Sequence, residues 1–313
     1  MSGKNKILPA SSVRLIEALE AAFSGTDLKI TKKAAGLALE TPGYTTNLDF
    51  LVPGDAGQVN GDIEAVVKIT TRLPDPIAAI FREPAATVPM NALATLGALT
   101  MDDEGLSIGS RLTLYGEERA LDIYIPLLLF SALSSAESLL GGMRVVFGNE
   151  EYSTSPSDWN SRDFAQVASH LERMSVCTSG PNRLTAEFPL HDGSISAAVG
   201  DPETALWTLQ SDQPHPTAGG GLLCLLQLPH SFNNEGSLDR ALLELNRLEM
   251  GSTDQPPHFG AWCRGGSGAN PAYITFLPNG LHDVKGLAVN ISFWAAARAR
   301  IANERLGSMG YTV

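Results

Sequence analysis

Histidine followed by aspartate occurs twice in this chain, and these residue types together serve as metal ligands in phosphohydrolases. His191-Asp192 and His282-Asp283 both follow predicted strands. A metal-dependent hydrolase needs further His and Asp ligands on helices, and the sequence offers none at suitable spacing. Gly193 and Asn279-Gly280 mark turns beside the two pairs. We therefore interpret both pairs as turn residues.

Four other side chains are of types that bind zinc, namely His230, His258, Cys224 and Cys263. A zinc site usually shows paired ligands at close spacing, as in C-x-x-C. Here His258 and Cys263 form the closest pair, and no second close pair exists. We expect buried thiols and no metal. The cysteines, with Cys177 as the third, are odd in number and widely spaced, which indicates a reducing compartment rather than a disulfide framework.

The stretch Gly265–Gly268 and the cluster Asp102–Glu104 also resemble functional loops. A nucleophile elbow needs G-x-S-x-G, but Ala269 follows Gly268. A phosphate loop needs a following lysine and a helix, and here a predicted strand follows. The acidic cluster lacks the alternating oxygen ligands of a calcium loop. We predict a hairpin loop and a solvated turn, and hence no catalytic residue and no cofactor.

Composition restricts the class of protein. The chain has 313 residues, 43% of them hydrophobic and 18% charged, as in a folded protein large enough for two domains. Its net charge is −12, and acidic residues outnumber basic ones on both sides of Pro156. Neither half is therefore expected to bind nucleic acid or an anionic membrane. No apolar stretch follows the N-terminal lysines, and Ile125–Leu133 is too short to span a bilayer, so we expect a cytoplasmic protein.

The clearest series of elements is in Gly236–Leu306. Leucines 238, 242, 245 and 248 fall on one face of a helix capped by Ser237. His258–Cys263 and Ala272–Leu277 follow as short strands. A long helix begins at Asp283, and Trp294 and Ile301 lie on its apolar face. We expect Trp207, Trp262 and Trp294 to belong to the core.

A looser version of this series occurs at Ala86–Gly142. Met90, Leu93, Leu96 and Leu99 predict an apolar helix face. Leu106–Ile108 and Arg111–Tyr115 are strand candidates. A helix from Pro126, with Leu133 and Leu140 on its apolar face, is expected to end at Gly141-Gly142.

The segments before each series extend the similarity. A helix at Ser11–Phe23 precedes strands at Leu28–Thr31, Gly36–Glu40, Leu48–Val52 and Ile63–Thr71, with Phe81–Val88 irregular. A helix capped by Ser161 precedes strands at Arg183–Leu190, Ser194–Val199, Ala205–Gln210 and Leu222–Leu228. Val145–Asn160 has little periodicity and reads as a linker. The sequence predicts one domain at residues 8–144, a linker at 145–160 and a second domain at 161–307.

This order of elements, α-β-β-β-α-β-β-α, resembles the type III secretion chaperone-like fold, in the branch of the YbjN-type bacterial sensory-transduction regulators. The resemblance is carried by the helix with the pair Leu245-Asn246, the strands His258–Cys263 and Ala272–Leu277, and the closing helix. The first copy lacks a Leu-Asn pair in register. The resemblance implies two tandem α+β domains with antiparallel sheets and no catalytic residues, which bind protein segments or a second copy of the domain.

We therefore expect a non-enzymatic protein that binds a protein partner or a peptide segment. The two domains are expected to form a pseudo-dimer within one chain, with inter-domain contact through Leu133, Leu140, Trp294 and Ile301. Two alternatives remain: a regulator that binds a small ligand between the domains, and a hydrolase built on the His and Ser residues above. A deep polar pocket would favour either alternative, and a shallow apolar groove would favour protein binding.

Overall fold

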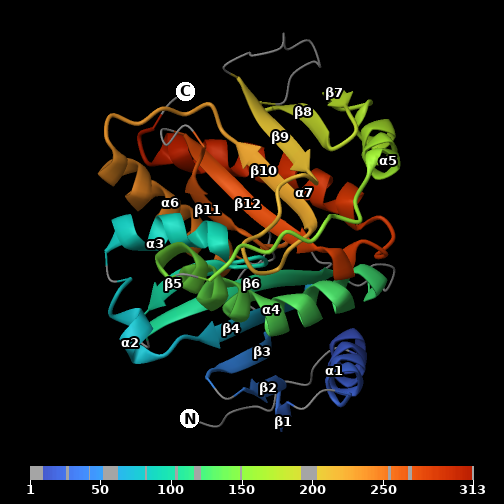
Figure 1. Cartoon of the computed structure of the whole chain (residues 1–313), viewed down its shortest axis with the longest axis vertical. Helices are drawn as coiled ribbons and strands as arrows, with labels where there is room; N and C mark the ends of the chain where they lie inside the picture. Colours follow the sequence, from blue (N-terminus) through green and yellow to red (C-terminus); the bar gives the residue numbers. More distant parts are fainter. Residues whose placement is uncertain are drawn as a thin grey trace.

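Two antiparallel six-stranded sheets lie one above the other along the long axis of the molecule (Figure 1). The structure is a computed structural model that describes residues 10–25, 28–41, 43–51, 63–81, 83–102, 105–115, 121–148, 150–191, 203–252, 255–266 and 270–311. Helices cover the sheets, so the predicted α+β class with antiparallel sheets is confirmed.

The first half begins with α1 (Ala10–Phe23), which buries Leu15, Leu19 and Phe23. Four strands follow: β1 (Lys29–Lys33), β2 (Gly36–Glu40), β3 (Thr45–Leu51) and β4 (Ile63–Arg72). The short helices α2 (Asp75–Ala78) and α3 (Pro84–Met90) and the 3-10 turn η1 (Asn91–Leu93) lead to β5 (Ala98–Asp102) and β6 (Gly105–Tyr115). The long helix α4 (Leu121–Phe147) ends this half.

The second half begins with α5 (Ser161–Leu171), whose N-cap is Asn160. Its strands are β7 (Val176–Ser179), β8 (Arg183–Pro189), β9 (Thr204–Gln210) and β10 (Gly221–Gln227). Helix α6 (Glu235–Gly251) precedes β11 (Ala261–Arg264) and β12 (Pro271–Pro278). The 3-10 turn η3 (Asn279–Leu281) and helix α7 (Leu287–Ser308) complete it.

Both sheets have the same strand order. The first reads β1-β2-β3-β4-β6-β5, and the second reads β7-β8-β9-β10-β12-β11. In each half, four described strands precede the middle helix, as many as the strand candidates named from the sequence and one more than in the order α-β-β-β-α-β-β-α. In the second half β7 was not among the predicted strands. The strand predicted at Ser194–Val199 lies outside the described residues.

Alternation of side chains explains which face of each sheet is covered. Successive residues of a strand point to opposite faces, and in β8 the side chains of Leu184, Ala186 and Phe188 are buried while their neighbours are less so. Helices α5 and α7 pack on the buried face of the second sheet, as α1 and α4 do on the first. One hydrophobic core cluster extends from Leu15 to Leu306 and includes residues of both halves.

The halves meet through α3, α6 and the strands β5, β6, β11 and β12, in the middle of the molecule (Figure 1). Two backbone hydrogen bonds cross this contact at equivalent positions. The amide of Arg111 in β6 donates to the carbonyl of His258 (3.0 Å), and the amide of Phe276 in β12 donates to the carbonyl of Thr95 (3.0 Å). His258 and Thr95 each lie a few residues before the fifth strand of their half. These two hydrogen bonds are thus equivalent, whereas a third, from the amide of His258 to the carbonyl of Arg111 (2.7 Å), is formed on one side of the contact.

An asparagine plays the same part in each half. The side-chain oxygen of Asn246 in α6 accepts from the amide of Trp262 (2.8 Å), the second residue of β11. The side-chain oxygen of Asn91, directly after α3, accepts from the amide of Leu99 (2.7 Å), the second residue of β5. The first half has Met90 before its asparagine where the second has Leu245. The Leu-Asn pair is absent from the first copy, as expected, but its asparagine is present.

Several predictions for the first half were wrong. The helix predicted through Met90, Leu93, Leu96 and Leu99 ends at Met90, because the Asn91 side chain bonds the backbone of β5 and Leu99 belongs to that strand. The region Phe81–Val88, predicted as irregular, contains most of α3, with Pro84 at its first position. The two strand candidates at Leu106–Ile108 and Arg111–Tyr115 are parts of one strand, β6.

Helix α4 is longer than predicted at both ends. It starts before Pro126 and continues through Gly141-Gly142 to Phe147, so the predicted linker loses its first residues to the helix. Both glycines are buried against neighbouring side chains, which explains their presence inside a helix. Among the described residues, α4 is the one helix long and apolar enough to cross a membrane by length and composition, and 44% of its most apolar window is buried.

Candidate functional site

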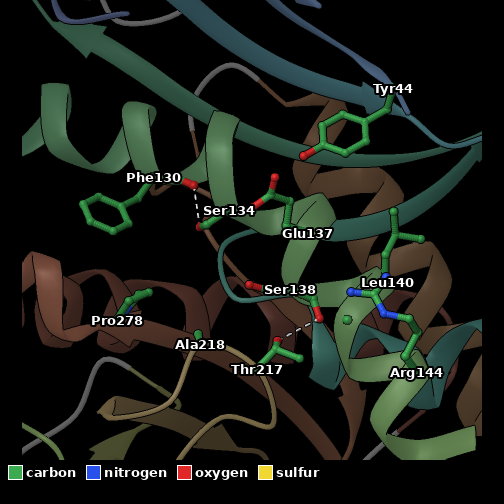
Figure 2. A pocket seen from close by; sticks show the side chains of 11 residues that line it. Tyr44, Phe130, Ser134, Glu137, Ser138, Leu140, Arg144, Thr217, Ala218 and Pro278 are labelled. Carbon is green, nitrogen blue, oxygen red and sulfur yellow. Dashed lines mark hydrogen bonds between the residues drawn. The ribbon is translucent and has the colours of Figure 1, made fainter. Parts of the chain in front are cut away.

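One face of α4 lines a cleft of about 620 Å³ between the two halves (Figure 2). Its residues recur every three or four positions and therefore share one side of the helix. This face consists of Phe130, Ser134, Glu137, Ser138, Gly141 and Arg144, with Leu140 beside it. Opposite lie Thr217, Ala218 and Pro278 of the second half. Tyr44, just before β3, completes the lining.

Two close contacts hold α4 against the second half. A Cβ atom on Gly141 would lie 2.7 Å from Cγ2 of Thr217, and one on Gly280 would overlap the ring of Phe130. Only glycine leaves room for such approaches. Phe130 and Gly141 are eleven residues apart, which corresponds to about 16 Å along the helix. Most of the cleft opens between these two contacts, so its shape depends on how the halves fit together.

Hydroxyl groups lie along the floor of the cleft. The hydroxyl of Thr217 donates to the carbonyl of Ser138 (3.3 Å) and thereby joins the halves. The hydroxyl of Ser134 donates to the carbonyl of Phe130 (2.6 Å) within α4, which leaves its oxygen able to accept. The floor therefore presents hydrogen-bond acceptors to a ligand.

A carboxylate and a phenol face each other at the upper wall of the cleft (Figure 2). Burial, and next to it the Glu137 carboxylate, raise the pKa of Tyr44 to about 12. The Tyr44 hydroxyl is close to Glu137, but within the described residues it has no hydrogen-bond partner of standard geometry. Glu137 makes no ion pair within the same residues, whereas Arg144 is paired with Glu150 (3.1 Å). Within these residues no cationic side chain therefore neutralises the Glu137 charge, and the Tyr44 phenol is its neighbour in the cleft.

Thr217 is also next to a histidine, which is the closest arrangement to a catalytic pair in this cleft. Its hydroxyl lies 3.3 Å from Nδ1 of His215. The same nitrogen accepts from the backbone amides of Thr217 (3.3 Å) and Ala218 (3.1 Å), so it is already occupied. Burial lowers the pKa of His215 to about 4, which makes the imidazole a weak base. His215 therefore stabilises the turn at residues 215–219 by accepting hydrogen bonds from its backbone amides.

A buried polar network lies behind the contact between the halves. Glu249 of α6 accepts from Nδ1 of His258 (2.9 Å), Nε1 of Trp262 (2.7 Å) and Nε of Arg298 (2.8 Å). The neighbouring Arg298 and these donors hold the pKa of Glu249 well below its usual range, although burial opposes this. Since the carboxylate only accepts, the imidazole proton is on Nδ1.

The backbone between α6 and β11 is held by an arginine from each half. Arg298 of α7 donates to the carbonyl of Pro257 (2.6 Å). Arg111 of β6 reaches across from the first half and donates to the carbonyls of Gln255 (3.0 Å) and Pro256 (2.7 Å). The first half therefore fixes the segment that carries His258, and this segment connects the buried network to the contact between the halves.

The four residues predicted at the inter-domain contact lie at different places. Trp294 of α7 stacks on Tyr124 of α4, with ring centroids 6.5 Å apart, so this pair joins the halves. Leu140 lines the cleft. Leu133 packs against the main core cluster, and Ile301 is half-buried on α7. Of the hydrogen bonds described above between the halves, one involves helix α4, at Ser138, and the others join strands and loops.

The residues considered as zinc ligands do not form a cluster. Among the described residues, no group of three or more His, Cys, Asp or Glu side chains could hold a metal ion. Cys224 and Cys263 are buried free thiols, and burial raises the pKa of Cys263 to about 12. His282, considered above as part of a His-Asp pair of a metal-dependent hydrolase, bonds Asp163 of α5 (3.1 Å). Trp207 and Trp262 are fully buried, as predicted.

The sequence contains a signal for the cleft that is not a catalytic motif. Ser134, Glu137, Ser138 and Gly141 are polar or small residues at helical spacing within an otherwise apolar helix. Tyr44 and Thr217 carry no such signal, because only the packing of the halves brings them to α4.

Comparison of the chain with protein-family models gave no match, and comparison with curated proteins and with solved structures gave no significant match. Function is therefore inferred from the geometry.

Proposed function

We propose that this chain is a non-enzymatic binding protein, chaperone-like or regulatory, made of two tandem copies of one α+β domain. The copies correspond to residues 8–144 and 161–307, joined by the linker 145–160. They act as a pseudo-dimer within one chain and bind a protein partner or peptide segment, as the resemblance to secretion chaperone-like proteins implies. The main support is the contact between the halves, where each half accepts a backbone hydrogen bond from the other at an equivalent position, His258 in the second half and Thr95 in the first.

The free edges of the two sheets support binding of an extended segment. Each sheet has one edge strand at the contact between the halves, β5 or β11, and one at the far end, β1 or β7. Strand β1 carries three lysines, all with acidic or amide partners on neighbouring elements, which protects an edge from pairing. Strand β7 carries no charged residue, and Val176 is 44% exposed. It is the edge that favours addition of a peptide strand.

An array of short synthetic peptides, probed with the full chain, tests this function. We expect binding to a subset of peptides that can form extended strands. Val176→Lys should weaken this binding, because it gives β7 the charge that guards β1. Val13→Lys is the matched control, since Val13 in α1 is exposed to a similar extent (41%). A chain that binds no peptide, or in which the two variants weaken binding equally, would contradict the proposal.

A second candidate function has its own observation. The cleft between α4 and the second half is lined by both halves, and its volume of about 620 Å³ is within the range of about 300–1,000 Å³ of small-molecule sites. This supports a regulator that binds a small ligand between the domains. Ligand binding there would act on the fit of the halves directly.

A further inference from the structure

We infer that the cleft between α4 and the second half binds an organic cation, an alkylammonium or guanidinium group. The inference deepens the second candidate function and depends on the cleft being a binding site. It is independent of the free edge at β7.

The polar groups in the cleft match a ligand that donates hydrogen bonds. Within the described residues, the carboxylate of Glu137 has no ion pair, and the nearby hydroxyl of Tyr44 makes no hydrogen bond of standard geometry. A carboxylate can only accept, whereas ammonium and guanidinium groups can only donate. Since the Ser134 hydroxyl already donates to Phe130, its oxygen is a third acceptor. The three groups come from two different elements and converge on one side of the cleft (Figure 2).

The apolar groups in the cleft match the stem of such a ligand. Phe130 and Pro278 lie at the other end of the lining, on opposite sides of the cleft (Figure 2). Phe130 and Glu137 are seven residues apart in α4, so about 10 Å of helix separates the apolar end from the carboxylate. Long cationic side chains bury an alkyl stem and keep a charged end on a polar partner. A linear alkyl chain with one charged end fits this arrangement.

The charges around the cleft favour a cation over an anion. Arg144 is the one cationic side chain in the lining, and Glu150 already pairs with it. With Glu137 included, carboxylates outnumber cations at the cleft. The chain as a whole has a net charge of −12, which raises the local concentration of cations. An anionic ligand would meet the unpaired Glu137, and like charges at close range are unfavourable.

Two sources of this chemistry are possible, a free small-molecule cation and a Lys or Arg side chain of a bound partner. Calorimetric titration of the full chain separates them. The probes are Nα-acetyl-lysine methylamide, its neutral analogue Nα-acetyl-norleucine methylamide, spermidine, and a lysine-containing peptide. We expect the lysine derivative to bind at least about tenfold more tightly than the norleucine derivative, because a charged hydrogen-bond partner is lost in the latter. Tightest binding of spermidine would identify a free cation, and tightest binding of the peptide a partner side chain.

Variants locate the site. Glu137→Gln should weaken binding of the lysine derivative about tenfold, and Tyr44→Phe several-fold, because each removes an acceptor. Glu304→Gln removes the same charge from an exposed position on α7 and should leave binding unchanged. Glu137 is exposed, so its variant should remain folded, which the thermal unfolding midpoint checks. Equal binding of the two derivatives, no detectable binding of any cation, or equal loss in the two glutamate variants would overturn the inference. Peptide binding that is lost in Val176→Lys and kept in Glu137→Gln would leave the first proposed function intact.

Discussion

Replacing Glu249 by glutamine should destabilise the protein far more than the loss of one surface charge would. Glu249 is 1% exposed and accepts hydrogen bonds from His258, Trp262 and Arg298. Arg298 is also buried, at 3% exposed, so no water replaces the carboxylate. The glutamine side chain is neutral and presents an NH₂ group to donors. It therefore leaves the Arg298 charge without a counter-charge and at least one donor without an acceptor.

The burial of both charges sets the expected loss of stability in Glu249→Gln. Removing one partner of a buried ion pair costs about 3–5 kcal/mol, because the remaining charge stays buried and unpaired. We expect Glu249→Gln to lower the free energy of unfolding by this amount. The double variant Glu249→Leu with Arg298→Met removes both charges and fills the same space with apolar atoms. Such replacements are often neutral, so the double variant should be more stable than Glu249→Gln.

Urea unfolding followed by tryptophan fluorescence measures these differences. Glu244→Gln is the control on the same helix, since Glu244 pairs with Arg247 at the surface. It should change the free energy of unfolding by no more than about 1 kcal/mol, as exposed pairs do. If Glu249→Gln is as mild as Glu244→Gln, or if the double variant is the least stable of the three, the buried pair does not stabilise the contact between the halves as we describe.

Three further predictions concern pH and the fit of the halves. Burial lowers the pKa of His215 to about 4 and also lowers the pKa values of His230 and His258, so below pH 6.5 the unfolded chain binds more protons than the folded chain. The urea concentration at the unfolding midpoint should therefore fall between pH 7 and pH 4. A midpoint that stays constant over this range would contradict the prediction. Gly141→Ala should lower the free energy of unfolding by about 1–3 kcal/mol, because the added methyl group overpacks against Thr217. Gly307→Ala is the control, since Gly307 has open space around it and the change should not destabilise the protein. Equal urea midpoints of the two variants would refute the close contact at Gly141. Trp294→Asp breaks the stack with Tyr124 and should cause self-association, measured by light scattering. Phe293→Asp, at an exposed neighbouring position, should remain monomeric. If both variants are monodisperse, Trp294 does not hold the halves together.

The elements of the second half follow closely from local sequence. Asn279-Gly280 and the leucines of α6 have strong local signals, and the predicted strands at 258–263 and 272–277 overlap β11 and β12. The boundaries differ where a side chain forms a cap that spacing alone does not reveal. Asn234 rather than Ser237 caps α6, because its side-chain oxygen accepts from the Ser237 amide (2.9 Å). The closing helix α7 begins four residues after Asp283, behind Gly286 in a left-handed conformation.

The first half was harder to predict because long-range contacts decide its local structure. Leu96 and Leu99 have the spacing of a helix face, but Leu99 pairs with Ile108 in the sheet. Serines 131 and 135 of α4 bond the carbonyl of Leu96 (3.0 and 2.8 Å), and neither bond is visible in a sequence window. The cleft has the same origin, since Tyr44, Glu137 and Thr217 are far apart in the chain. Only its α4 face shows a periodic pattern.

The contact between the halves shares one equivalent backbone hydrogen bond on each side, but the amide of His258 also donates to the carbonyl of Arg111 (2.7 Å), and the side chains differ. At equivalent positions, the segment at His258 meets Arg111, whereas the segment at Thr95 meets Phe276. Two second halves from different molecules would therefore place Phe276 where Arg111 holds the carbonyls of Gln255 and Pro256, and these carbonyls would lose their donors. Two first halves would face each other with an arginine each and no buried Glu249 to balance them. The side chains thus select the unlike partner, so that during synthesis a completed first half does not pair stably with the first half of a neighbouring chain.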